Sequence, residues 1–285
     1  MLRRISTTLD MIKVQHSVFA LPWAFLGALY AADGLPAWST LGWILLAMVS
    51  ARSAAMAFNR VVDRRYDAEN PRTSKRALPA GLLSPAFAAA FAAVMAGLLL
   101  LAAWRLNPLC LKLAPLALFI VTIYSYTKRF TPLCHFVLGL SLAIAPVGAW
   151  IAVRPDAWSH PFPWLLGAAV LFWIAGADIL YACEDLDFDR SKGLHSIPAA
   201  LGLKGALVVS AICHAVTVGA LATAGWAGKR GAWWYGTTAS IAALLAYEHA
   251  IVKPSDMSRV NRAFFHVNAV VSGVILAGAC LDLRR

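Results

Sequence analysis

The sequence predicts an all-α integral membrane protein with nine transmembrane helices, and three observations lead to this fold class. The chain has 285 residues, of which 60% are hydrophobic and only 14% are charged. Its mean hydropathy of +0.68 is far above that of an ordinary soluble domain. Apolar runs of about 20 residues, enough to cross about 30 Å of hydrocarbon as a helix, recur along the whole chain. The third observation is an uneven distribution of Lys and Arg between the connections.

The nine apolar runs are the expected membrane helices. The first run follows basic residues and resembles a signal peptide, but no clear cleavage motif comes after it, so we expect it to be retained. The second and sixth runs lead directly into acidic motifs. No long linker or low-complexity tract interrupts the series, and we therefore expect one domain over residues 1–285. In chain order the runs are residues 16–33, 38–59, 84–103, 108–127, 134–153, 164–183, 205–226, 233–252 and 264–282.

The Lys and Arg residues predict the orientation of these helices. With a cytoplasmic N-terminus and alternating helices, 17 of them fall in cytoplasmic segments and six outside, while Arg52 and Lys112 lie within expected helices. This imbalance follows the positive-inside rule. The net charge of +11 is thereby explained by membrane topology, with no need for nucleic acid as a partner. We expect a multi-pass protein of the inner (cytoplasmic) membrane. The five cysteines are scattered without a C-x-x-C pair, which argues against a disulfide framework or zinc site.

Two cytoplasmic connections, residues 60–83 and 184–204, are longer than the others and carry seven of the 14 acidic residues. Each has a D-x-x-x-D pair, followed by basic residues and then a proline turn, "ALPAG" in the first connection and "SIPAA" in the second. These similarities predict an internal repeat. By the parity of the helices, both copies emerge on the same side of the membrane, where their acids can face one another across one cavity.

The spacing of the acids supports this repeat. Asp63 and Asp185 are separated by 122 positions, and so are Asp67 and Asp189. Residues four apart share one face of a helix, so each pair is expected to stack, and Asn59 extends the first ladder inward. Two carboxylates about 6 Å apart repel by roughly 3 kcal/mol at an effective dielectric constant near 20. The acids therefore need nearby cations.

Two kinds of cation are candidates. Neighbouring arginines would form salt bridges, which is the purely structural alternative. Mg²⁺ prefers oxygen ligands, uses one or two carboxylates and completes its coordination with water and substrate phosphates. The bases near the motifs exceed what the acids need, and a metal with surplus bases favours a diphosphate site. At the mouth of an apolar bundle, such a site suits an isoprenyl diphosphate. The bases that we expect to bind it are Arg72, Arg76, Lys128, Arg129 and Lys192.

Three motifs carry a resemblance to a known family. They are "NRVVDRRYD" at 59–67, "YSYTKR" at 124–129 and "DILYACEDLDFDRSKGLHSIPAALG" at 178–202, and together they resemble the UbiA-type membrane prenyltransferases. The resemblance implies nine helices around a central cavity that opens laterally to lipid, with cytoplasmic caps over the active site. It also implies Mg²⁺, a polyprenyl diphosphate and a small aromatic acid as ligands, and a lipid bilayer as surroundings.

By motif match, Asn59 belongs to the first metal-diphosphate motif as a substrate-binding residue, and four aspartates are the implied metal ligands. Many relatives have Asn-Asp at the start of this motif, but here the second position is Arg60, so no metal role is assigned to it. The implied metal ligands are Asp63, Asp67, Asp185 and Asp189.

Further candidates lie deeper in the expected helices. Arg52 precedes Asn59 by seven residues, about two turns, and an arginine within a membrane helix is a functional candidate because its burial is costly. We expect it to meet the acceptor's carboxylate or the diphosphate, the alternative being a structural partner such as Asp178. Asp178 or Asp185 could orient or deprotonate the acceptor phenol, and this choice stays open. Tyr124 and Tyr181 are candidates to line the path of the allylic cation.

Other functions remain in view. A secondary transporter also combines repeats with intramembrane charges, although its coupling residues usually lie near the bilayer midplane. A Mg²⁺ channel would have acid rings without surplus bases. Within the family, "EDLDFDR" and "GLHSIPA" are most similar to the 4-hydroxybenzoate polyprenyltransferase branch, and prenylation of 1,4-dihydroxy-6-naphthoate is the alternative. The length of the prenyl chain, the oligomeric state and the roles of His195 and Glu248 are left open.

Overall fold

Helices make up this computed structural model, which describes residues 2–13, 17–253, 257 and 259–284. Each of the nine apolar runs falls mainly within a helix, with differences of a few residues at the ends, and residue 16, where the first run was expected to start, lies outside the described residues. No strand occurs in the described ranges. The corresponding helices are α2 (Ser17–Ala32), α3 (Trp38–Val62), α5 (Pro85–Leu106), α6 (Pro108–Thr127), α7 (Cys134–Val153), α8 (Pro161–Ala182), α10 (Ile197–Ala227), α11 (Ala232–Ile251) and α13 (Asn268–Asp282).

Within the described residues, seven helical segments are long and apolar enough to cross a membrane. They comprise α3, α5, α6, α7, α8, α10 and α13, the last extended at its start by a π-helical turn, η4 (Ala263–Val267). The apolar stretch of α2, Ala20–Ala32, is shorter. Helix α11 has 20 residues but includes several polar and aromatic side chains, which lower its hydropathy. The protein is therefore a multi-pass membrane protein, and the count of nine crossings stays a prediction.

Helix α10 begins earlier than we predicted. The apolar run predicts a start at residue 205, whereas the helix begins at Ile197, next to the proline turn of the second acidic connection. Ser196 caps it by accepting a hydrogen bond from Ala199 N, and Pro198 occupies its first turn. Gly202, with φ of 70°, kinks the helix one turn later. Because of this kink, the first turn of α10 forms the end of the connection, and the rest of the helix forms the predicted membrane span.

The chain divides into two compact units, which are described separately. The first comprises Met1–Ser17 and Gly42–Tyr126, and the second comprises Val18–Leu41 and Thr127–Arg285. In the first unit, the end of α1 (Leu2–Met11) packs with α3, α5 and the connection before α5, through a cluster that includes Met11, Ala57 and Leu78. Our expectation of a single domain over the whole chain stays a prediction.

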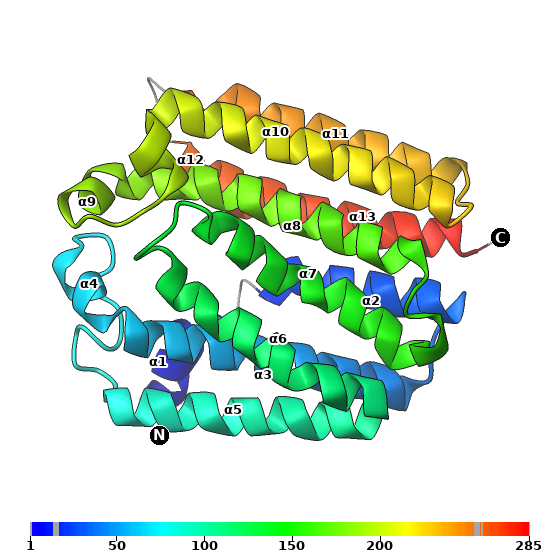
Figure 1. Cartoon of the computed structure of the whole chain (residues 1–285), viewed down its shortest axis with the longest axis horizontal. Helices are drawn as coiled ribbons and strands as arrows, with labels where there is room; N and C mark the ends of the chain where they lie inside the picture. Colours follow the sequence, from blue (N-terminus) through cyan, green and yellow to red (C-terminus); the bar gives the residue numbers. More distant parts are fainter. Residues whose placement is uncertain (1, 14–16, 254–256, 258, 285) are drawn as a thin grey trace. The chain divides into compact units, whose positions relative to one another are not determined.

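In the second unit, α8 packs against α7 on one side and α10 on the other, and α11 packs against α10 and α13 (Figure 1). Its core is rich in aromatic side chains, among them Trp23, Phe162, Trp173 and Trp234, each at most 2% exposed. Small residues let the helices approach closely. A Cβ atom at Gly139 of α7 would overlap the carbonyl oxygen of Leu171 in α8.

A buried polar network explains Glu248, whose role the sequence left open. Glu248 of α11 is 0% exposed and accepts a hydrogen bond from Asn268 Nδ2 at 3.3 Å. Asn268 Oδ1 accepts another from Trp173 Nε1 at 2.6 Å. The second carboxyl oxygen of Glu248 lies 3.9 Å from His214 Nδ1, and His214 is in turn 2.9 Å from His249. The polar side chains of α11 thus connect this helix with α10 and α13, and Asn268 extends the network to α8.

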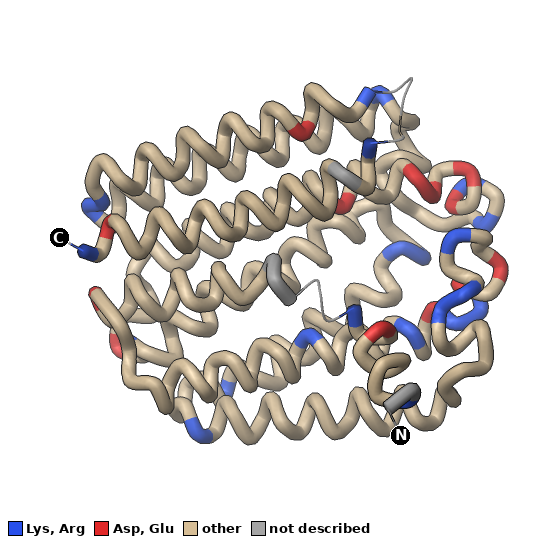
Figure 2. The backbone as a smooth tube through the Cα atoms, turned by 180° about the vertical axis from the view of Figure 1, so that it is seen from behind, with Lys and Arg blue, Asp and Glu red and all other residues tan. Residues whose placement is uncertain are grey.

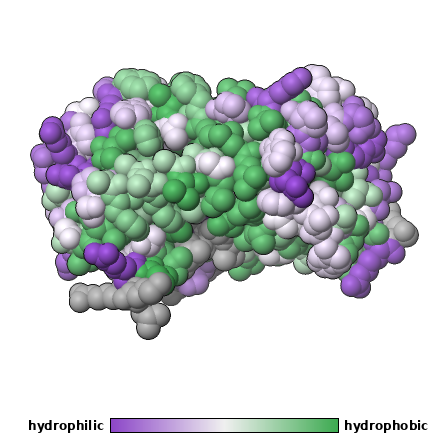
Figure 3. Space-filling model, turned by 90° about the horizontal axis from the view of Figure 1, so that it is seen from below, coloured by the Kyte–Doolittle hydropathy of each residue, from purple (hydrophilic) through white to green (hydrophobic). Residues whose placement is uncertain are grey.

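Charged residues concentrate in the connections and at helix ends, while long stretches of the helices carry none (Figure 2). Hydrophobic side chains cover much of the helical surface drawn in Figure 3. Many large apolar side chains are exposed, for example Trp104, Phe119 and Val208 at 60–61%. Such a surface is suited to hydrocarbon and would be costly in water.

We predict that Gly139→Ala weakens the packing of α7 on α8. The added methyl group has to displace backbone of α8, and overpacking of this kind costs about 1–3 kcal/mol. The measurement is the thermal unfolding midpoint of the purified protein in detergent. Gly148→Ala is the matched control in the same helix, because its new methyl group would meet only Ile144 Cγ2 at 3.9 Å. Equal midpoints for the two variants would contradict the α7–α8 contact.

Candidate active site

The first acidic motif continues the spacing of α3 through a break in the helix. The spacing predicts that Asn59, Asp63 and Asp67 form one helical ladder, but α3 ends at Val62, and the short helix α4 (Arg64–Glu69) follows with Asp63 between them. Asp63 N still donates to Asn59 O, and Asp67 N to Asp63 O, both at 2.8 Å. The four-residue spacing therefore persists although the helix is interrupted.

Asn59 joins the ladder through its side chain. Its Nδ2 donates to Asp63 Oδ2 at 2.7 Å and lies 3.4 Å from Ser125 Oγ on α6. The predicted proximity of Asn59 and Asp63 is therefore confirmed. Ser125, which the sequence analysis did not single out, lies in the "YSYTKR" motif and links this motif to the first ladder.

Arg60 takes an internal role in the first motif. It is 6% exposed, and its Nη1 donates to Asn59 Oδ1 at 3.2 Å while its Nε donates to Met11 O at 3.4 Å. The same Nη1 lies 3.8 Å from Asp67 Oδ2. Because Arg60 holds the amide oxygen of Asn59, the amide nitrogen is directed at Asp63. Arg60 thus organises the motif from inside, which its sequence position did not reveal.

The second acid of this ladder, Asp67, is buried and paired with a base. Arg76 Nη1 contacts Asp67 Oδ1 at 2.7 Å. Arg76, which we expect to bind the diphosphate, therefore also forms an ion pair with Asp67. Thr73 Oγ1 donates to Asp67 O at 3.0 Å and ties the following turn to α4. Asp67 Oδ2 is buried without a hydrogen bond from any described residue.

The second acidic motif repeats the first in local structure. Helix α8 ends at Ala182, a 3₁₀ turn η3 (Cys183–Asp185) follows, and then comes α9 (Leu186–Ser191). Helices α4 and α9 both have six residues and are offset by the same 122 positions as the acids. The residue before each helix also has nearly the same backbone conformation, with φ, ψ of −91°, 6° at Asp63 and −100°, 7° at Asp185. The predicted internal repeat is therefore present in the backbone of these two segments.

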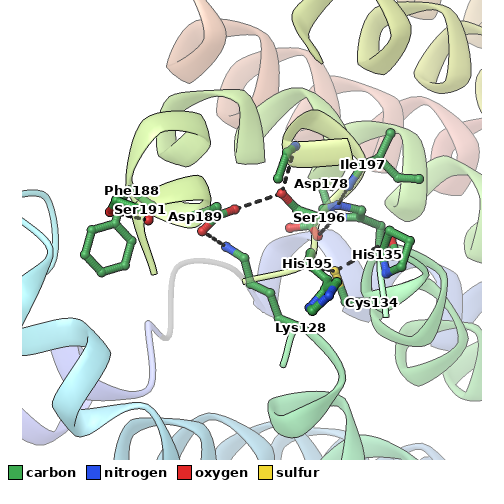
Figure 4. Close-up of polar contacts among 12 residues, drawn as sticks. Lys128, Cys134, His135, Asp178, Phe188, Asp189, Ser191, His195, Ser196 and Ile197 are labelled. Carbon is green, nitrogen blue, oxygen red and sulfur yellow. Dashed lines mark hydrogen bonds and ion pairs between the residues drawn. The ribbon is translucent and has the colours of Figure 1, made fainter. Parts of the chain in front are cut away.

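Asp189, the second acid of the second ladder, is completely buried and has two partners (Figure 4). Lys128 Nζ lies 2.8 Å from Asp189 Oδ1, and Ser196 Oγ donates to Asp189 Oδ2 at 2.8 Å. Burial disfavours the charged form of Lys128, but the Asp189 carboxylate outweighs this effect and raises the pKa of Lys128, with a further contribution from Asp185. Lys128 therefore stays protonated at neutral pH.

Backbone contacts hold the second connection against the start of α7. His195 N donates to Lys128 O at 2.7 Å, and Cys134 Sγ lies 3.5 Å from His195 O (Figure 4). The imidazole of His195 is exposed, so the contacts of this residue that the structure describes come from its main chain. The "YSYTKR" and "GLHSIPA" motifs, which are far apart in sequence, are thereby brought together.

Asp178 of α8 is held by a histidine that the sequence analysis did not single out. His135 Nδ1 of α7 lies 2.6 Å from Asp178 Oδ2, and Ile197 N donates to His135 Nε2 at 3.2 Å (Figure 4). The Asp178 side chain is 21% exposed, whereas His135 is almost completely buried. No pattern in the sequence marks His135, because its partners come from α8 and α10.

Arg52 lies in α3 without a neutralising acid among the described residues. Its Nε atom is buried and has no hydrogen-bond partner among the described residues, and Tyr124 of α6 interacts with it electrostatically. Tyr124 also interacts with Arg60. Tyr181 of α8 stacks on Phe264 with ring centroids 4.6 Å apart, so one of its faces is used for packing.

The remaining expected bases border the motifs. Arg72 and Lys192 are exposed, and Arg129 is half-buried. Arg72 N donates to Asn70 Oδ1 at 2.9 Å, which forms a tight turn directly after α4. Exposure leaves Arg72 and Lys192 accessible to an anionic ligand, and the roles of all three as diphosphate-binding residues stay predictions.

The structure groups the predicted residues within each unit. In the part of the chain that is described, no three His, Cys, Asp or Glu side chains come close enough to hold a metal. The donor set of Asp63, Asp67, Asp185 and Asp189 consists of carboxylate oxygens, the ligands that Mg²⁺ prefers. Asp67 Oδ2 is a buried oxygen to which no described residue donates a hydrogen bond, and this fits a cation site. The residues are thus chemically compatible with Mg²⁺.

A model of the UbiA prenyltransferase family matches residues 20–270. Among curated relatives, a 4-hydroxybenzoate octaprenyltransferase of Nitrosomonas europaea is 32% identical over 98% of this chain and 95% of its own length. One of the same name from Aromatoleum aromaticum is 31% identical over 93% of this chain and 89% of its own length.

Solved structures give the same result. The apo structure of a UbiA homologue from Aeropyrum pernix K1 is 36% identical, with a TM-score of 0.86 over 94% of this chain and 98% of that chain. A UbiA homologue from Archaeoglobus fulgidus, bound to DMAPP and Mg²⁺, is 19% identical, with a TM-score of 0.75 over 98% of this chain and 99% of that chain. With a family model over most of its residues and relatives above 30% identity along nearly its whole length, this chain belongs to the UbiA prenyltransferase family.

Proposed function

We propose that this protein transfers a polyprenyl group from a polyprenyl diphosphate to 4-hydroxybenzoate in respiratory quinone biosynthesis, with Mg²⁺ as cofactor. The observation that carries the proposal is the repeated structural unit in which a membrane helix ends, an aspartate follows and a short helix buries a second aspartate beside a base. The names of the curated relatives support the acceptor, and the family supports prenyl transfer.

The two acidic segments would bind the diphosphate end of the donor. Asp63, Asp67, Asp185 and Asp189 are the proposed ligands of Mg²⁺, which when bound would neutralise charge on the departing diphosphate. Bases around them supply further positive charge and hydrogen-bond donors. The ammonium of Lys128 is held at the second acid pair by its contact with Asp189 Oδ1 at 2.8 Å. The bases assigned to this role are Arg72, Arg76, Lys128, Arg129 and Lys192.

The reaction is an electrophilic aromatic substitution. The allylic carbon–oxygen bond of the donor breaks, diphosphate leaves with the bonding electron pair, a ring carbon of the acceptor forms the new carbon–carbon bond and that carbon loses its proton. Preorganised positive groups stabilise the charge that develops on the leaving diphosphate. Exclusion of water protects the allylic centre from hydrolysis, for which an apolar membrane interior is suited. Tyr124 and Tyr181 are the proposed aromatic neighbours of the cationic carbon.

Arg52 is the proposed partner of the acceptor's carboxylate. A guanidinium stays charged in proteins, and leaving it unpaired within a membrane helix is costly. Its buried Nε atom has no hydrogen-bond partner among the described residues, so a carboxylate ligand would supply the missing contact. This requirement suits an aromatic acid better than a neutral phenol. It also suits 1,4-dihydroxy-6-naphthoate, the alternative acceptor of menaquinone biosynthesis.

We further propose that the protein lies in the inner membrane with its N-terminus and both acidic connections in the cytoplasm. The excess of Lys and Arg in these connections supports this orientation. A secondary transporter is the alternative from another class. It is less well supported, because the acid pairs lie in the connections after α3 and α8 and not near the middle of broken membrane helices.

One prediction of this proposal is that activity depends on Mg²⁺ and on the aspartates of both motifs. Membranes containing the protein should convert 4-hydroxybenzoate and a polyprenyl diphosphate to the prenylated acid with Mg²⁺, and EDTA should abolish the reaction. Asp63→Ala and Asp185→Ala should each lower the rate by about 100-fold or more, because charge on the leaving group is no longer compensated. Product formation is measured by mass spectrometry.

The control for this experiment is Asp187→Ala, which removes an exposed acid of α9 between the two proposed ligands and should leave the rate nearly unchanged. Full activity of both ladder variants would refute the site assignment. Parallel reactions with 1,4-dihydroxy-6-naphthoate decide between the two acceptors, and proton-driven uptake without prenylated product would favour the transporter.

The second prediction concerns Arg52. Arg52→Met should reduce kcat/KM for 4-hydroxybenzoate by about 10- to 100-fold through the lost charged hydrogen bonds. It should have little effect on KM for the polyprenyl diphosphate. A comparison with a neutral 4-hydroxyphenyl ketone should show a much smaller loss, since this acceptor has no carboxylate. An equal loss for the acidic and neutral acceptors would show that Arg52 does not act through the acceptor's carboxylate.

A further inference from the structure

The contacts of Asp178 distinguish it from Asp185, although the sequence offered both as the residue that acts on the acceptor. Asp185 lies in the turn before α9 and interacts electrostatically with Lys128, a base of the proposed diphosphate site. Asp178 lies seven residues earlier in α8, about two helical turns further into the membrane span. Its hydrogen-bond partner is His135, which comes from α7.

The surroundings of His135 fix which of its ring nitrogens carries the proton. The backbone N–H of Ile197 points to His135 Nε2 at 3.2 Å, and an N–H group can only donate, so Nε2 must be the unprotonated acceptor. The proton of the neutral ring is therefore on Nδ1, 2.6 Å from Asp178 Oδ2. Ile197 is the first residue of α10, and its N–H has no partner within that helix. The imidazole satisfies this donor and Asp178 at the same time.

The same contact leaves one oxygen of Asp178 open. Oδ2 is used by His135, whereas no described residue hydrogen-bonds to Oδ1. The Asp178 side chain is 21% exposed, while the His135 side chain is only 2% exposed. The pair thus has a buried end, which is anchored to α10, and an accessible end, which presents a carboxylate oxygen in a fixed direction.

We propose that Asp178 Oδ1 accepts the hydrogen bond of the acceptor's hydroxyl group and that His135 is the positioning residue which holds Asp178 for this contact. The inference rests on the proposed prenyl transfer to a hydroxylated aromatic acid. A hydroxyl group that donates to a carboxylate is oriented in one plane and supplies more electron density to its ring, which is what attack on the allylic carbon requires. Asp185 then belongs to the diphosphate end and Asp178 to the acceptor end.

Substitutions of His135 separate positioning from packing. A glutamine can donate to Asp178 through its amide nitrogen and accept from Ile197 N through its amide oxygen, so His135→Gln can keep both contacts. His135→Phe fills a similar space and loses both. We expect His135→Phe to lower kcat/KM for the aromatic acceptor by about 10- to 100-fold, as is typical when a supporting hydrogen bond is lost, with KM for the polyprenyl diphosphate nearly unchanged. His135→Gln should restore most of the activity.

Asp178→Asn tests the open oxygen. The asparagine can still accept from His135 Nδ1, but its amide nitrogen then replaces Oδ1 and cannot accept from the acceptor's hydroxyl group. We expect a loss of at least about 100-fold in kcat/KM for the acceptor. Full activity of Asp178→Asn, or equal losses for His135→Gln and His135→Phe in folded protein, would overturn the proposal. Thermal midpoints in detergent identify variants that are unfolded.

A measurement that needs no catalysis completes the test. In protein labelled with ¹⁵N-histidine, the NMR signals that disappear in His135→Gln belong to His135, and they should show the tautomer protonated at Nδ1. An Nε2-protonated ring would overturn the assignment of His135 as the holder of Asp178. If the wild-type protein forms no prenylated product, the proposed function fails, and with it the acceptor contact, while the tautomer still decides whether His135 holds Asp178.

Discussion

A carboxylate that is buried at the end of a membrane helix needs a cation or hydrogen-bond donors beside it, and the two acidic segments depend on this constraint. Asp189 has no exposed surface, and it obtains compensation from the ammonium of Lys128 and the hydroxyl of Ser196. Removing one member of a buried pair typically costs about 3–5 kcal/mol, since the other charge stays behind. Together, these contacts hold Lys128 and the start of α10 beside α9 within the second unit. In the first unit, the Asp67–Arg76 contact connects α4 with the turn that follows it in the same way.

The sequence predicted the repeat because the repeat is encoded in spacing. The offset of 122 residues between the acid pairs is also the offset between α4 and α9, and the aspartate before each helix has a similar backbone conformation. Hydropathy likewise predicted the membrane helices, since a long apolar run has few other stable forms in a bilayer. Hydropathy is a weaker guide for α11, because this helix carries Glu248 and several aromatic residues. There Glu248 and His249 have hydrogen-bond partners on other helices, and such partners cannot be identified from one segment of sequence.

Residues that depend on tertiary contacts were the ones the sequence could not predict. Arg60 looked like a mere departure from the family's motif, but its guanidinium reaches Asn59 and the end of α1. His135 has no motif of its own, because its role comes from Asp178 on α8 and from the first N–H of α10. The start of α10 was misplaced because Gly202 allows a kink that joins a loop-like turn to a membrane helix. In each case the deciding partner is distant in sequence.

The polar residues within the membrane helices differ in how the free-energy cost of their burial can be reduced. A carboxyl group such as that of Glu248 can become neutral by taking up a proton, and Asn268 already donates to one of its oxygens. A guanidinium cannot lose its charge in this way at accessible pH, so Arg52 Nε, which has no hydrogen-bond partner among the described residues, needs an anion to satisfy it. Asp178 is intermediate, with one oxygen bound to His135 and the other open. Polar character alone therefore does not mark the substrate side. In the proposed function, the carboxylate of a hydroxylated aromatic acid is the expected partner of Arg52 Nε, and its hydroxyl group is the expected partner of Asp178 Oδ1.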